Sequence, residues 1–167
     1  MAASLGQIGL LPYYFPYLIC ILELFISSGF SIDLQCPLNC TCTGNLVDCS
    51  NLGLTDTPLD LPPWTSYLNL SFNKLTAIDQ AALSELPNLR ELRLGHNELT
   101  AIPSIGASSS NIVSLYLHHN RIRSIESSQL KPFISLETLD LTSNEITEIL
   151  KHLFSIGTAA QRHISGQ

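Results

Sequence analysis

The amino-acid sequence predicts an α/β-type solenoid, with a concave parallel sheet on one side and irregular or short helical segments on the convex side. Three observations predict this fold class. A pattern of the form LxxLxLxxNxL occurs four times, its asparagines recur every 23 or 24 residues, and a cluster of cysteines comes directly before the first copy. The copy from Leu89 to Leu99 reads LRELRLGHNEL and shows the pattern most completely.

The four copies define the repeats of a leucine-rich-repeat fold over residues 64–154. Their structural asparagines are Asn73, Asn97, Asn120 and Asn144. Alternate side chains of a short strand face opposite ways, so both leucines of each inner L-x-L are predicted to enter the core. Each asparagine carboxamide is predicted to satisfy backbone groups at the bend after the strand. Because one coil cannot bury its own leucines, stacked coils stabilise one another.

The segments between the strands are predicted to form the convex side. Residues 80–86 are predicted to form a helical turn, whereas residues 103–110 are rich in serine and glycine and are predicted to be irregular. Residues 127–133 return the third repeat to the sheet, with Leu130 and Phe133 predicted to enter the core.

Residues 1–29 differ in composition from the rest and are predicted to be a secretory signal peptide. The chain is almost wholly apolar from Leu10 to Ile26, and small residues suited to signal-peptidase cleavage follow at 27–29. A signal anchor is the rival interpretation. It is disfavoured because Glu23 and two prolines interrupt the apolar run, and a membrane-spanning helix needs about 20 apolar residues.

Residues 30–63 are predicted to be a cysteine-rich amino-terminal cap. Its cysteines are Cys36, Cys40, Cys42 and Cys49. An even number of cysteines in an exported chain favours two disulfides over a zinc site, whose cysteine pairs are more regularly spaced. Three disulfide pairings are possible, and the spacing does not distinguish them.

The cap is also predicted to cover the open end of the solenoid. Residues 41–43 and 46–49, joined across Gly44 and Asn45, are predicted to form a small hairpin. Such a hairpin protects the terminal coil, whose unpaired strand edge and exposed leucines otherwise invite aggregation.

The repeat pattern ends after Ile149. Residues 155–167 contain neither an LxxLxL segment nor a cysteine, and they are predicted to be a disordered, non-repeat tail. A chain that ends in this way is expected to be a fragment or an alternatively spliced product.

The composition argues against several classes of function. Charged residues make up 13% of the chain and the formal net charge is −6, so the chain has no basic stripe for nucleic acid. The sequence contains no G-x-S-x-G, no phosphate-binding glycine loop and no H-E-x-x-H. An open sheet face also lacks the enclosed pocket that a small-molecule substrate requires. We therefore predict neither an enzyme nor a cofactor, and we expect a protein partner.

The outward positions of the strands are predicted to form the binding face, because parallel strands stack about 4.8 Å apart and align equivalent residues in rows. The first row is Asn69, Arg93, Tyr116 and Asp140, the second is Tyr67, Glu91, Ser114 and Thr138, and the third is Phe72, His96, His119 and Ser143. The predicted partner-binding residues are Arg93, Tyr116, Tyr67, Glu91, Phe72 and Asp140. Arginine and tyrosine carry much of the binding energy of interfaces, so Arg93 and Tyr116 are the first choices.

Three histidines, His96, His118 and His119, allow two sharper hypotheses: a shared metal ion and a sensor of endosomal pH. Neighbouring coils would bring His96 and His119 close together. We predict no metal site, because no carboxylate or cysteine is expected nearby to complete a ligand set.

Two N-x-Ser/Thr motifs for N-glycosylation begin at Asn39 and Asn69. A glycan on Asn69 would obstruct one end of the binding face. A disulfide beside Asn39 would limit the use of the other motif.

The sequence resembles the family of leucine-rich repeats and immunoglobulin-like domains proteins over about residues 36–154. The matching segments are CPLNCTCTGNLVDCS (36–50), LPPWTSYLNLSFNKLTAID (61–79), LPNLRELRLGHNELTAIPSIGASSSNIVSLYLHHNRIRSIESSQLK (86–131) and SLETLDLTSNEITEI (135–149). The connection IPSIGASSSNI is more specific than the leucines, which every protein of this fold shares.

The resemblance implies a single-pass cell-surface glycoprotein whose repeats bind receptor ectodomains and modulate growth-factor receptor tyrosine kinases, with relatives of the epidermal growth factor receptor as partners. It also implies disulfides that pair Cys36 with Cys42 and Cys40 with Cys49. The later repeats, immunoglobulin-like domains, membrane span and cytoplasmic tail of that family have no counterpart in this sequence, so cleavage of the signal would leave the chain secreted. The alternative is a secreted matrix or adhesion protein, which binding to sulfated glycans or collagen would favour.

Overall fold

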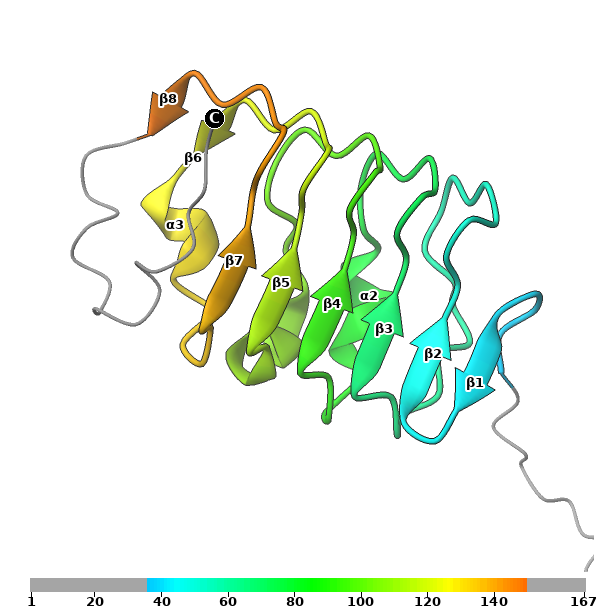
Figure 1. Cartoon of the computed structure of the whole chain (residues 1–167). Helices are drawn as coiled ribbons and strands as arrows, with labels where there is room; N and C mark the ends of the chain where they lie inside the picture. Colours follow the sequence, from blue (N-terminus) through cyan, green and yellow to red (C-terminus); the bar gives the residue numbers. More distant parts are fainter. Residues whose placement is uncertain (1–35, 150–167) are drawn as a thin grey trace, which may run out of the picture. The chain divides into compact units, whose positions relative to one another are not determined.

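The computed structural model describes residues 36–149, in which short strands lie side by side in one sheet and short helical segments lie behind it (Figure 1). The sheet has the order β1-β2-β3-β4-β5-β7, and all pairs after the first are parallel. Its strands are β1 (Thr41–Thr43), β2 (Leu46–Asp48), β3 (Tyr67–Asn69), β4 (Glu91–Arg93), β5 (Ser114–Tyr116) and β7 (Thr138–Asp140). This architecture confirms the predicted solenoid. The predicted signal peptide and carboxy-terminal tail lie outside the described residues.

Three rows of side chains cross the parallel strands in register. The middle row is Val47, Leu68, Leu92, Leu115 and Leu139, and none of these side chains is more than 4% exposed. The two flanking rows run from Leu46 to Thr138 and from Asp48 to Asp140, and they face away from the core. The pleat of a strand dictates this alternation, so the repeat pattern correctly predicted which face is buried.

The amino-terminal cap extends the sheet as well as covering its end. β1 and β2 form the predicted hairpin, with Gly44 at φ +59° in the turn, and β2 pairs in parallel with β3. A positive φ suits glycine because it has no Cβ to collide with the backbone. Disulfides join Cys36 to Cys42 and Cys40 to Cys49. This is the pairing that the family resemblance implies, and it leaves none of these thiols free for zinc.

In the part of the chain that the structure describes, the convex side contains three short helical segments: α2 (Gln80–Ser84), the 3₁₀ helix η1 (Gly106–Asn111) and α3 (Ser127–Leu130). α2 lies within the segment predicted to form a helical turn. α3 lies within the segment predicted to return the third repeat to the sheet, and its Leu130 is buried together with Phe133, as expected.

The helix η1 corrects the prediction that residues 103–110 are irregular. Gly106 begins it with φ +63°. The hydroxyl of Ser108 then donates hydrogen bonds to the carbonyls of Leu83 (2.7 Å) and Leu86 (3.0 Å) in the preceding coil. The segment is ordered here because the hydroxyl of Ser108 satisfies carbonyls at the end of the neighbouring helix.

A second, two-stranded parallel sheet joins β6 (Ser124–Ile125) to β8 (Glu148–Ile149). It was not predicted, because strands of two residues leave no periodic pattern in the sequence. Within residues 36–149, no helix is long and apolar enough to cross a membrane.

The buried asparagines connect successive coils. Nδ2 of Asn97 donates hydrogen bonds of 3.0 Å to the carbonyl of Leu94 in its own coil and to that of Leu70 in the preceding coil. Its Oδ1 accepts a hydrogen bond of 3.0 Å from the backbone N–H of Leu75. The asparagines of the next two repeats make the same three contacts. One short side chain therefore satisfies the backbone groups of two bends at once.

This network begins in the cap. Nδ2 of Asn73 donates to the carbonyl of Cys49 at 2.9 Å. Its Oδ1 accepts from the backbone N–H groups of Leu52 at 3.1 Å and Leu54 at 3.0 Å. The cap and the repeats are therefore linked by one continuous set of hydrogen bonds.

Replacing Asn97 with alanine is expected to lower the free energy of unfolding by roughly 2–4 kcal/mol, because each buried polar group left without a partner costs about 1–3 kcal/mol. Chemical denaturation followed by circular dichroism measures this change. Asn88→Ala is the matched control, because Asn88 is exposed and a surface substitution of this kind changes stability by less than about 0.5 kcal/mol. Equal losses in the two variants would contradict the role of the buried carboxamide.

Candidate functional site

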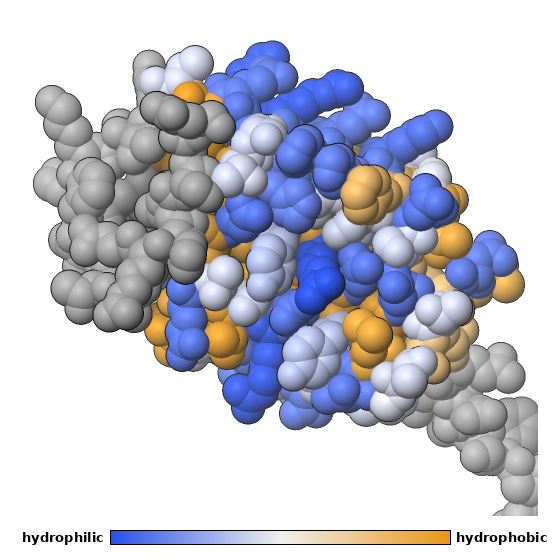
Figure 2. Space-filling model, viewed as in Figure 1, coloured by the Kyte–Doolittle hydropathy of each residue, from blue (hydrophilic) through white to orange (hydrophobic). Residues whose placement is uncertain are grey.

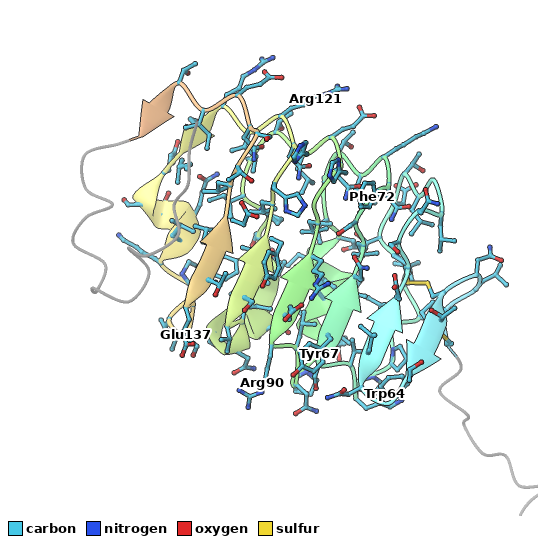
Figure 3. All side chains as sticks on the ribbon, viewed as in Figure 1. Trp64, Tyr67, Phe72, Arg90, Arg121 and Glu137 are labelled. Atoms are coloured by element: carbon cyan, nitrogen blue, oxygen red, sulfur yellow. A yellow bond between two sulfur atoms is a disulfide. The ribbon has the colours of Figure 1, made fainter. Side chains whose placement is uncertain are left out.

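Four of the predicted partner-binding residues lie together on the outward face of the sheet. One of them, Tyr67, is labelled in Figure 3. We call Tyr67, Glu91, Arg93 and Tyr116 the concave cluster. Arg93 connects it, because its Nε lies 2.6 Å from Oε1 of Glu91 and its Cζ lies 5.6 Å from the centre of the Tyr116 ring. Tyr67 is 40% exposed and the side chain of Arg93 is 53% exposed. The cluster therefore presents aromatic and charged groups to solvent.

Most of this face is hydrophilic, with a few apolar side chains between the polar ones (Figure 2). A shallow depression of about 290 Å³ lies at the capped end of the sheet. Its lining includes Leu46, Asp48, Tyr67, Asn69 and Arg93. The depression is therefore continuous with the concave cluster, and the cap contributes part of its wall.

Asp48 supplies a fixed negative charge to this depression. Burial raises the pKa of its carboxyl group, but hydrogen bonds with Ser50 and Asn69 and the positive charge of Arg93 outweigh burial. The pKa of Asp48 is therefore below its usual range, and the group is ionised at neutral pH.

The sequence analysis missed the contribution of β2 to this face. Leu46 and Asp48 pair in register with Tyr67 and Asn69, so they continue the two outward rows into the cap. The signal in the sequence is the segment VDC (47–49), which stands where the repeats have the inner L-x-L. It was missed because the hairpin was predicted without a register to the first repeat.

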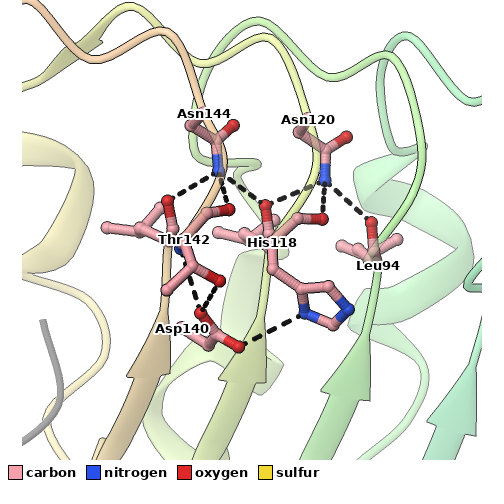
Figure 4. A network of polar contacts seen from close by, with 8 residues as sticks. Leu94, His118, Asn120, Asp140, Thr142 and Asn144 are labelled. Carbon is pink, nitrogen blue, oxygen red and sulfur yellow. Dashed lines mark hydrogen bonds and ion pairs between the residues drawn. The ribbon is translucent and has the colours of Figure 1, made fainter. Parts of the chain in front are cut away.

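The carboxylate of Asp140 is engaged within the chain. Its Oδ1 accepts hydrogen bonds from the backbone N–H (3.0 Å) and the hydroxyl (2.8 Å) of Thr142. Its Oδ2 lies 3.4 Å from Nδ1 of His118 (Figure 4). These contacts hold the carboxylate in one orientation, facing the histidine.

An aromatic column follows the strands at the bend of each coil. The ring of His96 stacks on the ring of Phe72 on one side and on that of His119 on the other, with centroid distances of 4.1 Å for both pairs. The three residues share a left-handed backbone, with φ of 58° at Phe72, 56° at His96 and 54° at His119. The sequence analysis predicted this row, and Phe72, which is 56% exposed, ends the column toward the cap.

His118 stands perpendicular to this column. Its ring is inclined by 87° to the ring of His96 and by 89° to that of His119, with centroid distances of 5.4 and 5.6 Å. The ring passes over Gly95, where a Cβ atom would collide with Nε2 of His118. We call His96, His118 and His119 the histidine cluster, because one ring nitrogen from each lies within 4.8 Å of the other two.

The structure corrects the premise that no carboxylate lies near these histidines, because Asp140 contacts His118. Asp140 pairs with Tyr116 across the strands, so it is a diagonal neighbour of His118 two residues further along. Diagonal neighbours in a sheet are within reach of long side chains, but row-by-row alignment of the sequence does not bring them together.

The two glycosylation motifs lie in different environments. Asn39 is exposed in the cap, whereas Asn69 is half-buried on β3 beside the depression. The hydroxyl-bearing residue of the second motif, Ser71, is only 7% exposed and donates its backbone N–H to Oδ1 of Asn69.

Comparison with known families agrees with this geometry. The profile of the family described as Leucine rich repeat matches residues 65–106 and 110–156, and that of the Leucine rich repeat N-terminal domain matches residues 35–62. The chain therefore belongs to the leucine-rich-repeat family and carries its amino-terminal cap domain.

Comparison with individual proteins indicates which members of this family the chain is similar to. The chain is 56% identical to human Leucine-rich repeats and immunoglobulin-like domains protein 1 over 122 residues, which is 73% of this chain and 11% of that protein. It is 46% identical to human Leucine-rich repeats and immunoglobulin-like domains protein 3 over 127 residues, 76% of this chain and 11% of the relative. These matches confirm the resemblance to that family.

A receptor is also similar to this chain. Leucine-rich repeat-containing G-protein coupled receptor 5A of Xenopus laevis is 43% identical over 94 residues, 53% of this chain and 10% of the receptor. Together, the repeats, the disulfide-bonded cap and these relatives identify an extracellular or secretory-pathway module of the kind that binds other proteins.

His96 should have a lowered pKa in a metal-free sample. Burial lowers the pKa of His96, and the neighbouring His119 and His118 lower it further. The folded chain therefore binds this proton less readily than the unfolded chain, whose histidine pKa is about 6.5. The contribution of His96 to stability is fully present above that pH and is lost as the pH falls from there through the folded-state pKa.

His119→Phe should raise the pKa of His96 toward the ordinary value, because it removes a neighbouring positive charge and keeps an aromatic ring in the column. Proton NMR of the imidazole signals, recorded as a function of pH with a chelator present, measures the pKa of His96 in the wild-type chain and in the variant. A His96 pKa that stays the same in the variant would contradict this account.

Proposed function

We propose that the concave cluster binds the extracellular domain of another protein, and that this partner is a growth-factor receptor tyrosine kinase. The observation that carries the proposal is the exposed side chain of Arg93, which packs against the half-buried ring of Tyr116 in the middle of the sheet. Arginine and tyrosine dominate binding energy at interfaces, and a side chain already held in place loses less entropy on binding.

The acidic side chains on the outward rows of the sheet favour a partner whose binding surface carries basic groups. Asp48, Glu91 and Asp140 lie on the outward rows against one arginine, Arg93. The whole chain also has 14 acidic against 8 basic side chains. Complementary charge speeds association and excludes partners with the wrong sign, so we infer a partner patch in which lysine or arginine surrounds an apolar centre.

In this proposal, the chain modulates receptor signalling by binding the receptor, and it catalyses no reaction. Support for the class of partner comes from the similarity to the leucine-rich repeats and immunoglobulin-like domains proteins. The chain spans 11% of the length of the two human relatives, so we assign to it only the recognition step.

The alternative function, that of a matrix or adhesion protein, requires a different distribution of charge on the same face. Binding sulfated glycans requires clustered basic groups, and the outward rows place Arg93 next to two carboxylates, Glu91 and Asp48. Binding of the chain to heparin or collagen, with no binding to receptor ectodomains, would replace the proposed function with this one.

The double variant Arg93→Ala and Tyr116→Ala should weaken binding to the ectodomain of an epidermal growth factor receptor relative by at least about tenfold, since each hot-spot side chain contributes about 2 kcal/mol and about 1.4 kcal/mol is tenfold. Surface plasmon resonance with the secreted chain measures the dissociation constant. Lys131→Ala is the control, because Lys131 is an exposed cation at the end of α3, on the convex side. Affinity that is unchanged in the double variant, with secretion intact, refutes the proposed face.

We further propose that Asn69 carries an N-glycan that limits the binding face at its capped end. Asn69→Gln should remove one glycan and strengthen ectodomain binding, because the depression is then open. Peptide mapping after glycosidase treatment reports occupancy, and Asn39→Gln is the control that should leave ectodomain binding unchanged. An Asn69 without glycan in the secreted chain would rule out this limit.

A further inference from the structure

We propose that His96, His118 and His119 form a zinc-binding site on the concave side, with three imidazole ligands and a fourth position open to solvent. The inference does not depend on the identity of any protein partner. It starts from the distances, because one ring nitrogen of each histidine lies within 4.8 Å of the others. Three histidines and a water make up a ligand set that zinc commonly adopts in proteins.

The orientation of His118 is the strongest support. Its Nδ1 is buried without a hydrogen-bond partner and faces Oδ2 of Asp140 at 3.4 Å. Histidine ligands usually direct one nitrogen to a carboxylate, which orients the ring and makes the other nitrogen a better donor to the metal. Thr142 fixes the carboxylate through two hydrogen bonds, so Asp140 acts as a positioning residue for His118.

The other ring nitrogen of His118, Nε2, lies on the side of the ring away from Asp140 (Figure 4). Nε2 lies over Gly95, which directly precedes His96 in the chain. Any side chain at position 95 would occupy the space of the imidazole. The glycine therefore opens the path by which a ring from one coil reaches a histidine of the preceding coil.

The other two ligands are held by their backbone and by stacking. His96 and His119 occupy equivalent bends, with nearly parallel rings inclined by 20°. Nitrogen ligands of tetrahedral zinc lie about 3.3 Å apart, given zinc–nitrogen distances of about 2.0–2.1 Å. Two stacked rings cannot both direct a nitrogen at one ion, so zinc binding requires the ring of His119 to rotate out of the stack. His119 is exposed, so it can make this adjustment and the fourth position remains accessible.

The donor set selects the class of metal. Neutral imidazoles suit zinc and other late transition metals, whereas calcium and magnesium require several oxygen ligands. The fourth position would take water in the isolated chain, and a carboxylate or imidazole of a bound protein could replace that water.

The test is a titration of zinc chloride into the tag-free, full secreted chain, followed by calorimetry. We expect one zinc ion per chain bound at this site. Cobalt chloride, as a spectroscopic substitute, should give the intense visible absorption of a tetrahedral site. Zinc should also raise the melting temperature of the wild-type chain, because it binds the folded state.

His96→Phe is the sharpest variant, because Phe72 shows that phenylalanine fits the same backbone position and the same stack. It removes a ligand and keeps the column. Zinc affinity should fall by more than the roughly 10–100-fold expected for Asp140→Asn, which alters only the orientation of His118. Gly95→Ala should also abolish the site, because the new Cβ displaces the His118 ring without changing a ligand.

The remaining histidines of the chain provide the control. His152→Gln combined with His163→Gln should leave the affinity and the cobalt spectrum unchanged. Zinc binding that survives both His96→Phe and Gly95→Ala, or is lost with the control pair, overturns the proposal. The absence of any zinc-dependent heat in the wild-type chain overturns it too.

Discussion

The asparagine at the bend of each coil is the constraint on which the rest of the structure depends. A bend inside a stack of coils buries backbone N–H and C=O groups that cannot reach water. The carboxamide supplies both a donor and an acceptor, and that of Asn97 forms hydrogen bonds with its own coil and with the preceding one. Since every repeat is fixed to its neighbour in this way, the strands stay in register. The alignment of the outward rows therefore does not depend on contacts between the outward side chains.

That alignment gives one side of the sheet the two sites for which we propose binding. The concave cluster lies on the strands, where the exposed Arg93 packs against the half-buried ring of Tyr116. The histidine cluster lies at the bends, where Asp140 and Gly95 place His118 beside the aromatic column. Neither cluster contributes to the leucine core, so both can change in sequence while the fold is retained. The core determines where the side chains stand, and the outward rows determine what they bind.

The sequence predicted the parts that repeat or obey local rules. The strands, the buried leucines, the cap hairpin and α2 all follow from periodicity or turn chemistry, and the structure confirms them. The register of β2 against β3, the helix η1 and the contact between Asp140 and His118 were missed. Each of these depends on a hydrogen bond or a diagonal contact between coils. Such contacts depend on side-chain orientation, which a one-dimensional pattern does not contain.

The left-handed bend has a further consequence. Phe72, His96, His119 and Ser143 all have φ between 54° and 58°, so the backbone is the same whichever side chain it carries. The centroids of two adjacent pairs of rings lie 4.1 Å apart, so each pair is stacked. The repeat therefore places equivalent positions at a spacing at which planar side chains stack. The stack of rings ends at Ser143, which has no ring. Among residues 36–149, no further ring therefore stacks on His119 from the side of Ser143.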